Sequence, residues 1–452
     1  MSRYTAVTDH DLREMLDAIG VASVDDLFSA IPAALRLDRP LDLPAGLPEQ
    51  AVYEHLRELA ARNASTEDEV TFLGAGMYDH YVPAVIDMLM ERSEFLTPYT
   101  PYQPEISQGG LQVMFEYQTA ISELTGLPAS NASVYEGPSA LAAAGWLAAQ
   151  TSGRPRFVIS EGTHPHSRET LRTLSVGYQT TVDEVVLRDG ATDLDALRAA
   201  LDIDVAAVFV QQPNFLGAVE DLAALAQAAH EHGALLVVAA DPLTLGVLEA
   251  PGAQGADLCV GEGQTLGNRL DFGGPSFGFF ASTQAHLRKL PGRIAGETRD
   301  VDGRRGFVLT LQTREQHIRR EKATSNICTA QALNALGGVV YLAWLGREGL
   351  VELGELLHAR THYARETLAA LEGVEKLHDQ PVVREFALRL DAPVERVVAR
   401  CREAGIHPGL PLTDDGLLVA ITERRTRADI DRLADVLGAA VAAEREAVGV
   451  GA

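Results

Sequence analysis

The chain has 452 residues, more than one hydrophobic core usually supports, so its length predicts two domains or one large α/β domain with a smaller companion. Apolar residues make up 46% of the sequence, which excludes a disordered chain. Lys and Arg number 38 against 63 Asp and Glu, and the net charge of −25 argues against nucleic acid and membrane surfaces as partners.

Residues 1–65 are expected to form an N-terminal helical arm. The opening stretch MSRYTAVTDHDLREML has the character of a capped helix and lacks the apolar core of a secretory signal. Residues 34–50 contain prolines that predict an irregular connector. Residues 48–65 have the apolar spacing of an amphipathic helix that begins near a proline.

Residues 66–328 are expected to form a large domain. Residues 109–127 have helical spacing, and residues 131–150 predict a turn followed by a helix of small residues. Short apolar or β-branched runs follow, with helical stretches between several of them. These predicted strands are RPRFVIS (154–160), VDEVVLR (182–188), VAAVFVQQP (205–213), ALLVVAA (234–240) and ADLCVG (256–261). Their alternation with helices predicts a mostly parallel sheet with right-handed crossovers.

Residues 329–452 are expected to form a small α+β domain. Two helices are predicted over residues 329–346 and 349–371. The strand-like runs REFALRL (384–390) and GLLVAIT (416–422) follow, and each is joined to a helix.

The apolar runs and the cysteines indicate a cytoplasmic protein. The longest apolar run, near residues 234–240, is far too short to cross a bilayer. Cys259, Cys328 and Cys401 lie far apart in the sequence and have no metal-binding spacing. We therefore expect reduced thiols, as in cytoplasmic proteins.

The segment VYEGPSALAAAGWLA (134–148) is a candidate phosphate site. Gly137 and Ser139 open a helix and are followed by Ala140. Free N–H groups at a helix N-terminus attract anions. The same residue types also cap ordinary helices, so a structural role is the alternative.

Two further positions suggest a coenzyme cleft. Asp241 directly follows a predicted strand, where ligand sites of open α/β sheets lie, and its carboxylate could pair with the ring nitrogen of pyridoxal phosphate. His164 could stack on that ring, although a helix-capping loop explains it equally well. The spacing of His164 and His166 also fits two metal ligands, but no third ligand is near, so no metal site is expected.

In chain order, these features resemble the large domain of fold-type I pyridoxal-phosphate enzymes. That class presents a lysine on the glycine-rich bend after a strand, where the lysine forms an imine with the coenzyme. Here the bend in DLCVGEGQTLG (257–267) carries Gln264. The lysines of the chain, Lys289, Lys322 and Lys376, all lie elsewhere, and arginine cannot replace them in this chemistry.

Two longer stretches, residues 71–127 and 304–336, resemble the P-protein family of the glycine cleavage system. The similarity runs over nearly the whole chain, whose length corresponds to subunit 1 (alpha) of the family's two-subunit form. The resemblance implies that subunit 2 carries the lysine and pyridoxal phosphate, and that two copies of each subunit assemble. With that partner, the chain is expected to decarboxylate glycine and pass the aminomethyl group to the lipoyl arm of the H-protein.

The resemblance leaves this chain the task of lining part of the shared site, and the loop FLTPYTPYQPE (95–105) is the candidate. Its prolines restrict the backbone, and Tyr99 and Tyr102 carry hydroxyl groups suited to a small polar substrate. A rigid interface loop is the alternative. The remaining cleft residues would form a degenerate site that binds no coenzyme covalently: Gly137, Ser139, His164, Asp241 and Gln264.

The segment TREQHIRREKATSNIC (313–328) holds a basic cluster on this acidic chain, formed by Arg314, His317, Arg320 and Lys322. On one helix, Arg314 would align with His317, and His317 with Arg320. The cluster could bind a carboxylate or a phosphate. Pairing with acidic groups across a subunit interface is the favoured interpretation.

Two other functions stay open. A catalytically inactive fold-type I homologue could act only as a scaffold or regulator of subunit 2. A free-standing coenzyme enzyme that uses Lys289 or Lys322 would be yellow when purified alone and would react with borohydride.

Overall fold

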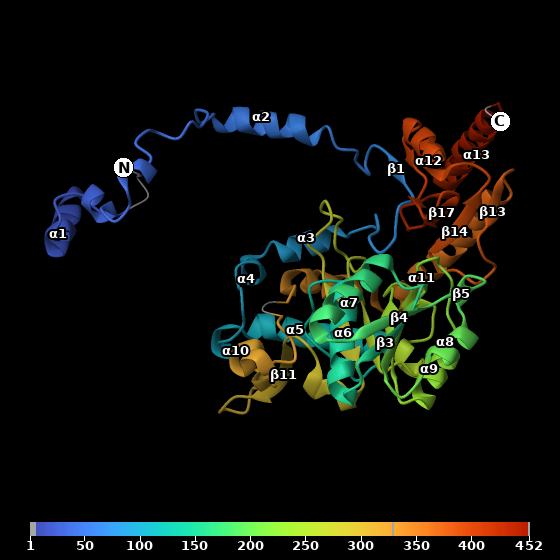
Figure 1. The fold of residues 1–452 in the computed structure, drawn as a ribbon, viewed down its shortest axis with the longest axis horizontal. Coiled ribbons are helices and arrows are strands. Elements are labelled where there is room, and N and C mark those ends of the chain that lie inside the picture. The colour runs from blue at the N-terminus through green and yellow to red at the C-terminus, as the bar shows by residue number, and fades with distance from the viewer. Residues whose placement is uncertain (1–5, 328–329, 451–452) are drawn as a thin grey trace. The chain divides into compact units, whose positions relative to one another are not determined.

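The computed structural model describes the backbone of residues 6–327 and 330–450 (Figure 1). The chain divides into two compact units, residues 1–64 and residues 65–452. The expected boundary at residue 328 lies outside the described residues, as does Cys328. The division of the second unit into a large and a small domain therefore stays a prediction.

The first unit contains two helices that the sequence predicts, α1 (Asp9–Ile19) and α2 (Glu49–Ala60). The Thr8 hydroxyl accepts a hydrogen bond from the Asp11 N–H, and the Asp11 carboxylate accepts one from the Thr8 N–H. This reciprocal cap satisfies backbone groups that the first turn of α1 leaves unpaired. Pro48 caps α2, and no side-chain hydrogen bond is needed there.

A seven-stranded sheet forms the centre of the second unit, in the order β2-β10-β9-β8-β7-β3-β4. Strands β9, β8, β7, β3 and β4 are parallel, while β10 is antiparallel to both β9 and β2. The bounds are β2 (Ala129–Ser130), β3 (Arg156–Ser160), β4 (Thr181–Val185), β7 (Val205–Gln212), β8 (Leu235–Ala240), β9 (Leu258–Glu262) and β10 (Gly278–Ser282). The five predicted strands are confirmed. β10 is not apparent from the sequence, because Gly273, Gly274 and Pro275 precede it and interrupt the apolar pattern.

Helices cover both faces of this sheet (Figure 1). Along β7, Val208 and Val210 belong to one buried cluster, with α5, α9 and α11, while Phe209 belongs to another, with α6 and α7. This alternation follows from the two-residue period of a strand and explains why β7 is apolar throughout. The bounds are α5 (Gln108–Thr125), α6 (Gly137–Ser152), α7 (Pro165–Tyr178), α8 (Leu194–Ala200), α9 (Leu222–Glu231) and α11 (Ala332–Ala369).

A second, four-stranded antiparallel sheet lies in the C-terminal part, in the order β13-β14-β17-β16. Phe386 and Val419 on its strands pack in a cluster with α12 and α13. The bounds are β13 (Val374–Lys376), β14 (Glu385–Leu390), β16 (Leu410–Pro411), β17 (Gly416–Ala420), α12 (Val394–Glu403) and α13 (Arg427–Val450). The predicted strands 384–390 and 416–422 are confirmed. The two predicted helices before them form α11, which turns at Gly346, where φ is +63°.

The remaining elements join these layers. They are the parallel pair β1 (Val70–Thr71) and β15 (Ile406–His407), the hairpins β5 (Leu187–Arg188)–β6 (Ala191–Thr192) and β11 (Ile294–Arg299)–β12 (Arg305–Thr310), and the helices α3 (Ala84–Met90), α4 (Ser93–Leu96) and α10 (Gln316–Arg319). Among the described residues, no helix has the length and apolar character needed to cross a membrane.

Candidate functional site

Gln264 lies on the bend after β9 and is completely buried. Its Oε1 accepts a hydrogen bond from the Tyr78 N–H at 2.9 Å. Its Nε2 donates to the Tyr78 carbonyl at 3.1 Å and to the Asn268 carbonyl at 2.9 Å. One side chain therefore satisfies both backbone groups of Tyr78, as a neighbouring strand would. We call residues 74–81, which Gln264 holds in this way, the strap.

Two other predicted cleft residues lie near the strap, one in direct contact and one through Arg384. His164 Nε2 lies 2.9 Å from the Ala75 carbonyl oxygen. Asp241 does not reach the strap itself; it accepts a hydrogen bond from Arg384 at 3.1 Å, and the Arg384 guanidinium lies over the Tyr78 ring, 3.6 Å from its centroid. The structure thus brings His164, Asp241 and Gln264 to the strap of this chain, directly for His164 and Gln264 and through Arg384 for Asp241.

Buried ionisable groups surround the strap. The Tyr78 hydroxyl donates to Glu385 Oε2 at 2.6 Å, and the Ala75 N–H donates to Glu385 Oε1 at 2.7 Å. Burial raises the pKa of Glu385 and, together with the nearby Glu385 charge, raises the pKa of Tyr78. Burial also lowers the pKa of His80 to about 4, so His80 is neutral at pH 7.

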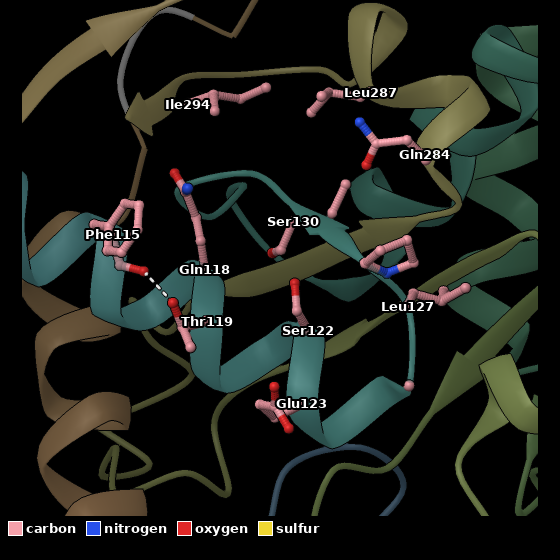
Figure 2. A pocket seen from close by; sticks show the side chains of 13 residues that line it. Phe115, Gln118, Thr119, Ser122, Glu123, Leu127, Ser130, Gln284, Leu287 and Ile294 are labelled. Atoms are coloured by element: carbon pink, nitrogen blue, oxygen red, sulfur yellow. Dashed lines mark hydrogen bonds between the residues drawn. The ribbon is translucent and has the colours of Figure 1, made fainter. Parts of the chain in front are cut away.

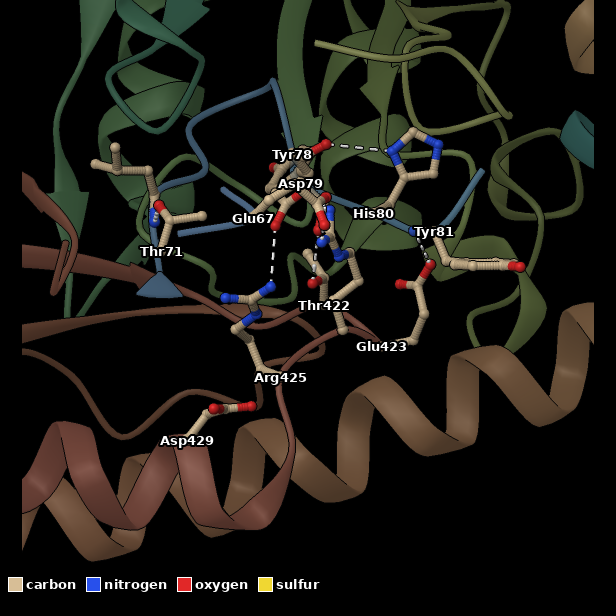
Figure 3. A network of polar contacts seen from close by, with 12 residues as sticks. Glu67, Thr71, Tyr78, Asp79, His80, Tyr81, Thr422, Glu423, Arg425 and Asp429 are labelled. Atoms are coloured by element: carbon tan, nitrogen blue, oxygen red, sulfur yellow. Dashed lines mark hydrogen bonds and ion pairs between the residues drawn. The ribbon is translucent and has the colours of Figure 1, made fainter. Parts of the chain in front are cut away.

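The C-terminal end of the strap is tied to the residues that follow β17 (Figure 3). The Thr422 hydroxyl donates to the Asp79 carbonyl at 2.8 Å, and Arg425 pairs with the Asp79 carboxylate at 2.9 Å. The Tyr81 N–H donates to Glu423 at 2.7 Å. Gln264 directly follows β9 of the seven-stranded sheet, and Glu385 lies on β14 of the four-stranded sheet, so the hydrogen bonds of the strap connect it to both sheets.

The predicted phosphate site at the start of α6 is also filled. The Gly137 N–H donates to the Glu262 carboxylate at 3.0 Å, and the Ser139 N–H donates to the Glu136 carboxylate at 2.8 Å. A Cβ atom on Gly137 would lie 3.0 Å from the Glu262 nitrogen, so α6 approaches the end of β9 closely. The N–H groups of Gly137 and Ser139 thus serve carboxylates of this chain, and burial raises the pKa of Glu262.

These contacts test whether pyridoxal phosphate fits this chain's own cleft. All three positions that the sequence predicts for the coenzyme make contacts within this chain: the predicted amine position, Gln264, binds Tyr78; the predicted ring partner, Asp241, pairs with Arg384; and the predicted phosphate position binds Glu136 and Glu262. Two carboxylates at the phosphate position would repel a phosphate dianion. The residues present therefore do not fit the coenzyme.

The tyrosines of the predicted site wall differ in their surroundings. The Tyr99 side chain is largely exposed, at 78%. Tyr102 is half-exposed, and its hydroxyl accepts a hydrogen bond from the buried Arg293 guanidinium at 2.8 Å. The Tyr102 ring centroid also lies 5.7 Å from that of His317. Among the residues that the structure describes, Tyr102, but not Tyr99, therefore contacts charged and titratable neighbours.

The basic segment is not one helix, so the predicted alignment of its residues is wrong. Arg314 ends a short 3₁₀ turn, and His317 lies in α10, after Glu315 in an extended conformation. Arg320 has a φ of +55°, which ends α10. Arg314 is buried, donates to the Leu290 carbonyl, and has its pKa lowered to about 10 by burial. Arg320 and Lys322 are exposed.

His166 and the cysteines carry no separate site in the described residues. No group of three or more His, Cys, Asp and Glu side chains there could hold a metal ion, and the His166 N–H only donates to His164 Nδ1. Cys259 and Cys401 are buried free thiols. Burial raises the pKa of Cys401 to about 11 and raises that of Cys259 as well, so neither is a reactive thiolate at pH 7.

A surface cavity of about 570 Å³ lies between α5, β2 and the start of β11 (Figure 2). Gln118, Ser122 and Glu123 on α5 face it, together with Leu287 and Ile294. None of the predicted site residues lines it, and we assign no chemistry to it.

Several residues in these contacts were missed by reading the sequence: Tyr78, Arg293, Arg384, Glu385, Glu136 and Glu262. Glu136 and Glu262 lie in the two segments quoted for the candidate phosphate site and for the bend, and Arg384 and Glu385 begin a predicted strand, but no pattern there indicated their contacts. Tyr78 and Arg293 also lie near a signal. Tyr78 lies in the stretch 71–127 that carries the family resemblance, and Arg293 follows a Pro-Gly pair that predicts a turn.

Comparisons with known proteins agree with this fold. The family model of the glycine cleavage system P-protein matches residues 2–437. The probable glycine dehydrogenase (decarboxylating) subunit 1 of Geotalea uraniireducens is 51% identical over 97% of this chain and 100% of its own length. The corresponding protein of Geobacillus kaustophilus is 49% identical over 97% of this chain and 99% of its own length.

Solved structures give the same result. The crystal structure of glycine decarboxylase (P-protein) of the glycine cleavage system in inhibitor-bound form matches with a TM-score of 0.89 at 46% identity, covering 97% of this chain and 100% of that one. Glutamate decarboxylase of Lactobacillus brevis matches with a TM-score of 0.69 at 14% identity, over 93% of this chain and 98% of that one, which shows the fold alone. The fold-type I prediction is confirmed, and the chain belongs to the glycine cleavage system P-protein family.

Proposed function

We propose that this chain is the subunit of a two-subunit glycine dehydrogenase (decarboxylating) that completes, but does not itself hold, the coenzyme site. The observation that carries the proposal is Gln264, whose amide binds Tyr78 at the position where a lysine would be needed. A second subunit then supplies the lysine and binds pyridoxal phosphate. The coenzyme acts there as the electron sink for loss of CO2 from glycine.

Our proposal gives this chain the task of walling the shared site. Tyr102 offers a hydroxyl group that a buried arginine orients, and Tyr99 lies three residues before it on the same loop. A wall of this kind orients glycine and keeps water from the reacting atoms. The basic residues Arg314, His317, Arg320 and Lys322 remain candidates for pairing with acidic groups of the partner, and Arg320 and Lys322 are exposed as such pairing requires.

The partners follow from the same proposal. Two copies of each subunit assemble, because each chain leaves part of its surface for the other to cover. The aminomethyl group passes from the assembled site to the lipoyl arm of the H-protein. The acidic charge of −25 disfavours nucleic acid and anionic membranes as further partners, and we place the complex in the cytoplasm.

A second candidate function is a scaffold that only supports or regulates the partner. The strap favours it, because a chain whose cleft is filled on all sides could serve as a rigid support. The two functions differ in the effect of Tyr99→Phe and Tyr102→Phe on turnover. A site wall predicts loss of turnover at subsaturating glycine with assembly intact, and a scaffold predicts unchanged turnover.

The direct test is reconstitution with a candidate subunit 2. Incorporation of labelled bicarbonate into the carboxyl group of glycine measures the reversal of CO2 loss, and it is followed for each subunit alone and for the mixture. We expect exchange only in the mixture. Exchange by this chain alone, or equal exchange by subunit 2 alone, would contradict the proposal.

A further inference from the structure

We propose that Arg293 is a positioning residue that fixes Tyr102 as a hydrogen-bond donor to the carboxylate of the amino-acid substrate; this inference rests on the proposed function. The Arg293 guanidinium donates to the Tyr102 hydroxyl at 2.8 Å, and its carbon lies 5.1 Å from the centroid of the Tyr102 ring. The one contact therefore orients both the hydroxyl and the ring of Tyr102.

The backbone that carries Arg293 is held by hydrogen bonds. Its side chain is only 4% exposed, and it lies directly before β11. The Arg293 carbonyl accepts a hydrogen bond from the Ala132 N–H at 2.8 Å, next to β2 of the seven-stranded sheet. The carbonyl of Pro291, two residues before Arg293, accepts a hydrogen bond from Asn131 Nδ2 at 2.9 Å. The guanidinium therefore projects from a backbone that the edge of the sheet holds in place.

The loop that carries Tyr102 is also held by Gln108, which follows it in the sequence. Gln108 Nε2 donates to the Pro104 carbonyl at 2.7 Å and to the Phe307 carbonyl at 2.9 Å. Gln108 Oε1 accepts a hydrogen bond from the Phe307 N–H at 2.8 Å. Because Phe307 lies on β12, paired with β11, the loop and Arg293 are attached to the same hairpin.

The chemistry of the contact sets the direction of the Tyr102 hydroxyl. Arginine only donates hydrogen bonds, so the Tyr102 oxygen is the acceptor in this contact, and its own proton points elsewhere. Tyr102 is 47% exposed, which leaves the hydroxyl proton accessible to a ligand. The positive charge behind the oxygen makes the hydroxyl a stronger donor and favours an anionic acceptor.

The substrate class follows from these properties. A donor backed by a buried cation fits a small carboxylate, which accepts hydrogen bonds through two oxygens. The α-carboxylate of an amino acid is such a group, and glycine has no side chain that would need further room. Tyr99 is three residues away, but among the described residues its side chain makes no hydrogen bond of this kind, so the geometry selects Tyr102.

The experiment measures the glycine dependence of bicarbonate exchange in the reconstituted complex. The variants are Tyr102→Phe, Arg293→Gln, Arg293→Lys and the double variant R293Q/Y102F. The controls are Arg299→Gln, an exposed arginine at the end of the same strand β11, and Tyr53→Phe, an exposed tyrosine on α2. Co-elution with the partner and the melting temperature show for each variant that the complex is folded and assembled.

We expect Y102F and R293Q each to raise the KM for glycine by roughly 10- to 100-fold, the loss of one hydrogen bond to a charged group. The kcat should change little, because a contact to the carboxylate acts on binding. R293Q/Y102F should raise KM no further than Y102F alone, since Arg293 acts through Tyr102. R293K keeps a charged donor, so its KM for glycine should be closer to the wild-type value than that of R293Q.

Other results would overturn the inference. Additive effects of R293Q and Y102F would mean that Arg293 acts independently of Tyr102, and an unchanged KM in R293Q would mean that it does not act on glycine binding. A KM change in R293Q that tracks only a loss of assembly would reduce Arg293 to a structural role. If the wild-type complex is inactive, the proposed function fails and this inference fails with it. If the wild-type complex is active and the variants give one of the contrary results above, only this inference fails.

Discussion

Replacing Gln264 by Lys places an amine at the position where we propose that the coenzyme lysine is missing, and we expect it to destabilise the chain without adding a coenzyme. Gln264 is completely buried and makes three hydrogen bonds, two to the Tyr78 backbone and one to the Asn268 carbonyl. An amine can still donate to the two carbonyl oxygens, but it cannot accept a hydrogen bond. The Tyr78 N–H would then be buried without an acceptor.

The magnitude has two parts. A buried backbone donor without a partner costs about 1–3 kcal/mol. Burial also lowers the pKa of the new amine below its value in the unfolded chain, and a fall of one pKa unit costs about 1.4 kcal/mol at pH values below the folded pKa. The missing acceptor and a fall of one pKa unit together predict a loss of about 2.5–4.5 kcal/mol in the free energy of unfolding at pH 7. The unfolded state keeps the proton of the new amine up to about pH 10, so the charge-related part of the loss shrinks as pH rises from the folded pKa toward about 10 and is absent above it.

Urea unfolding followed by circular dichroism at pH 7 and pH 9.5 measures these values for the wild type, Q264K and Q264M. Methionine has a similar volume and no charge, so Q264M should lose stability by an amount that does not depend on pH. After incubation with pyridoxal phosphate and borohydride, Q264K should carry no coenzyme at position 264. A Q264K chain as stable as the wild type that fixes one coenzyme at that position would refute the filled-cleft account.

Three further variants test individual contacts. Arg384→Met removes the buried guanidinium that pairs with the partly buried Asp241 carboxylate, and it should cost about 2–3 kcal/mol in urea unfolding. The double variant D241N/R384M should recover at least half of that loss, and an unaffected single variant would contradict the pairing. Burial lowers the pKa of His80 to about 4. Between pH 6.5 and pH 4, the unfolded chain therefore binds a proton at His80 that the folded chain does not bind. The free energy of unfolding should fall by about 3 kcal/mol as pH decreases through that window. His80→Gln should remove this part of the pH dependence, and equal slopes for the two proteins would refute it. Gln108→Ala frees the Tyr102 loop from Phe307 and should increase its cleavage in limited proteolysis severalfold; unchanged cleavage would mean that the loop is held elsewhere.

The parallel part of the fold could be predicted because its signals are local. The strands of the seven-stranded sheet are buried on both faces, so they appear in the sequence as continuous apolar runs separated by helices. β10 lies among glycines and a proline, and its pairing with β9 and β2 depends on residues far away in the sequence. The basic segment has helical spacing, but the positive φ of Arg320 ends α10 after a single turn.

The same distinction holds for the site. Gln264 could be proposed from the bend that carries it, because no lysine occurs there. Its partner Tyr78 is 186 residues away, and no local pattern indicates that a glutamine amide would pair with that backbone. Arg293 is likewise 191 residues from Tyr102, so its role depends on tertiary packing alone.

The central claim is that the coenzyme amine belongs to the partner chain. The most direct measurement assembles both chains with pyridoxal phosphate, reduces the complex with borohydride and maps the modified peptides by mass spectrometry. The account predicts the reduced coenzyme on a lysine of the partner and none on this chain. Modification of Lys289, Lys322 or Lys376 in proportion to activity would contradict it.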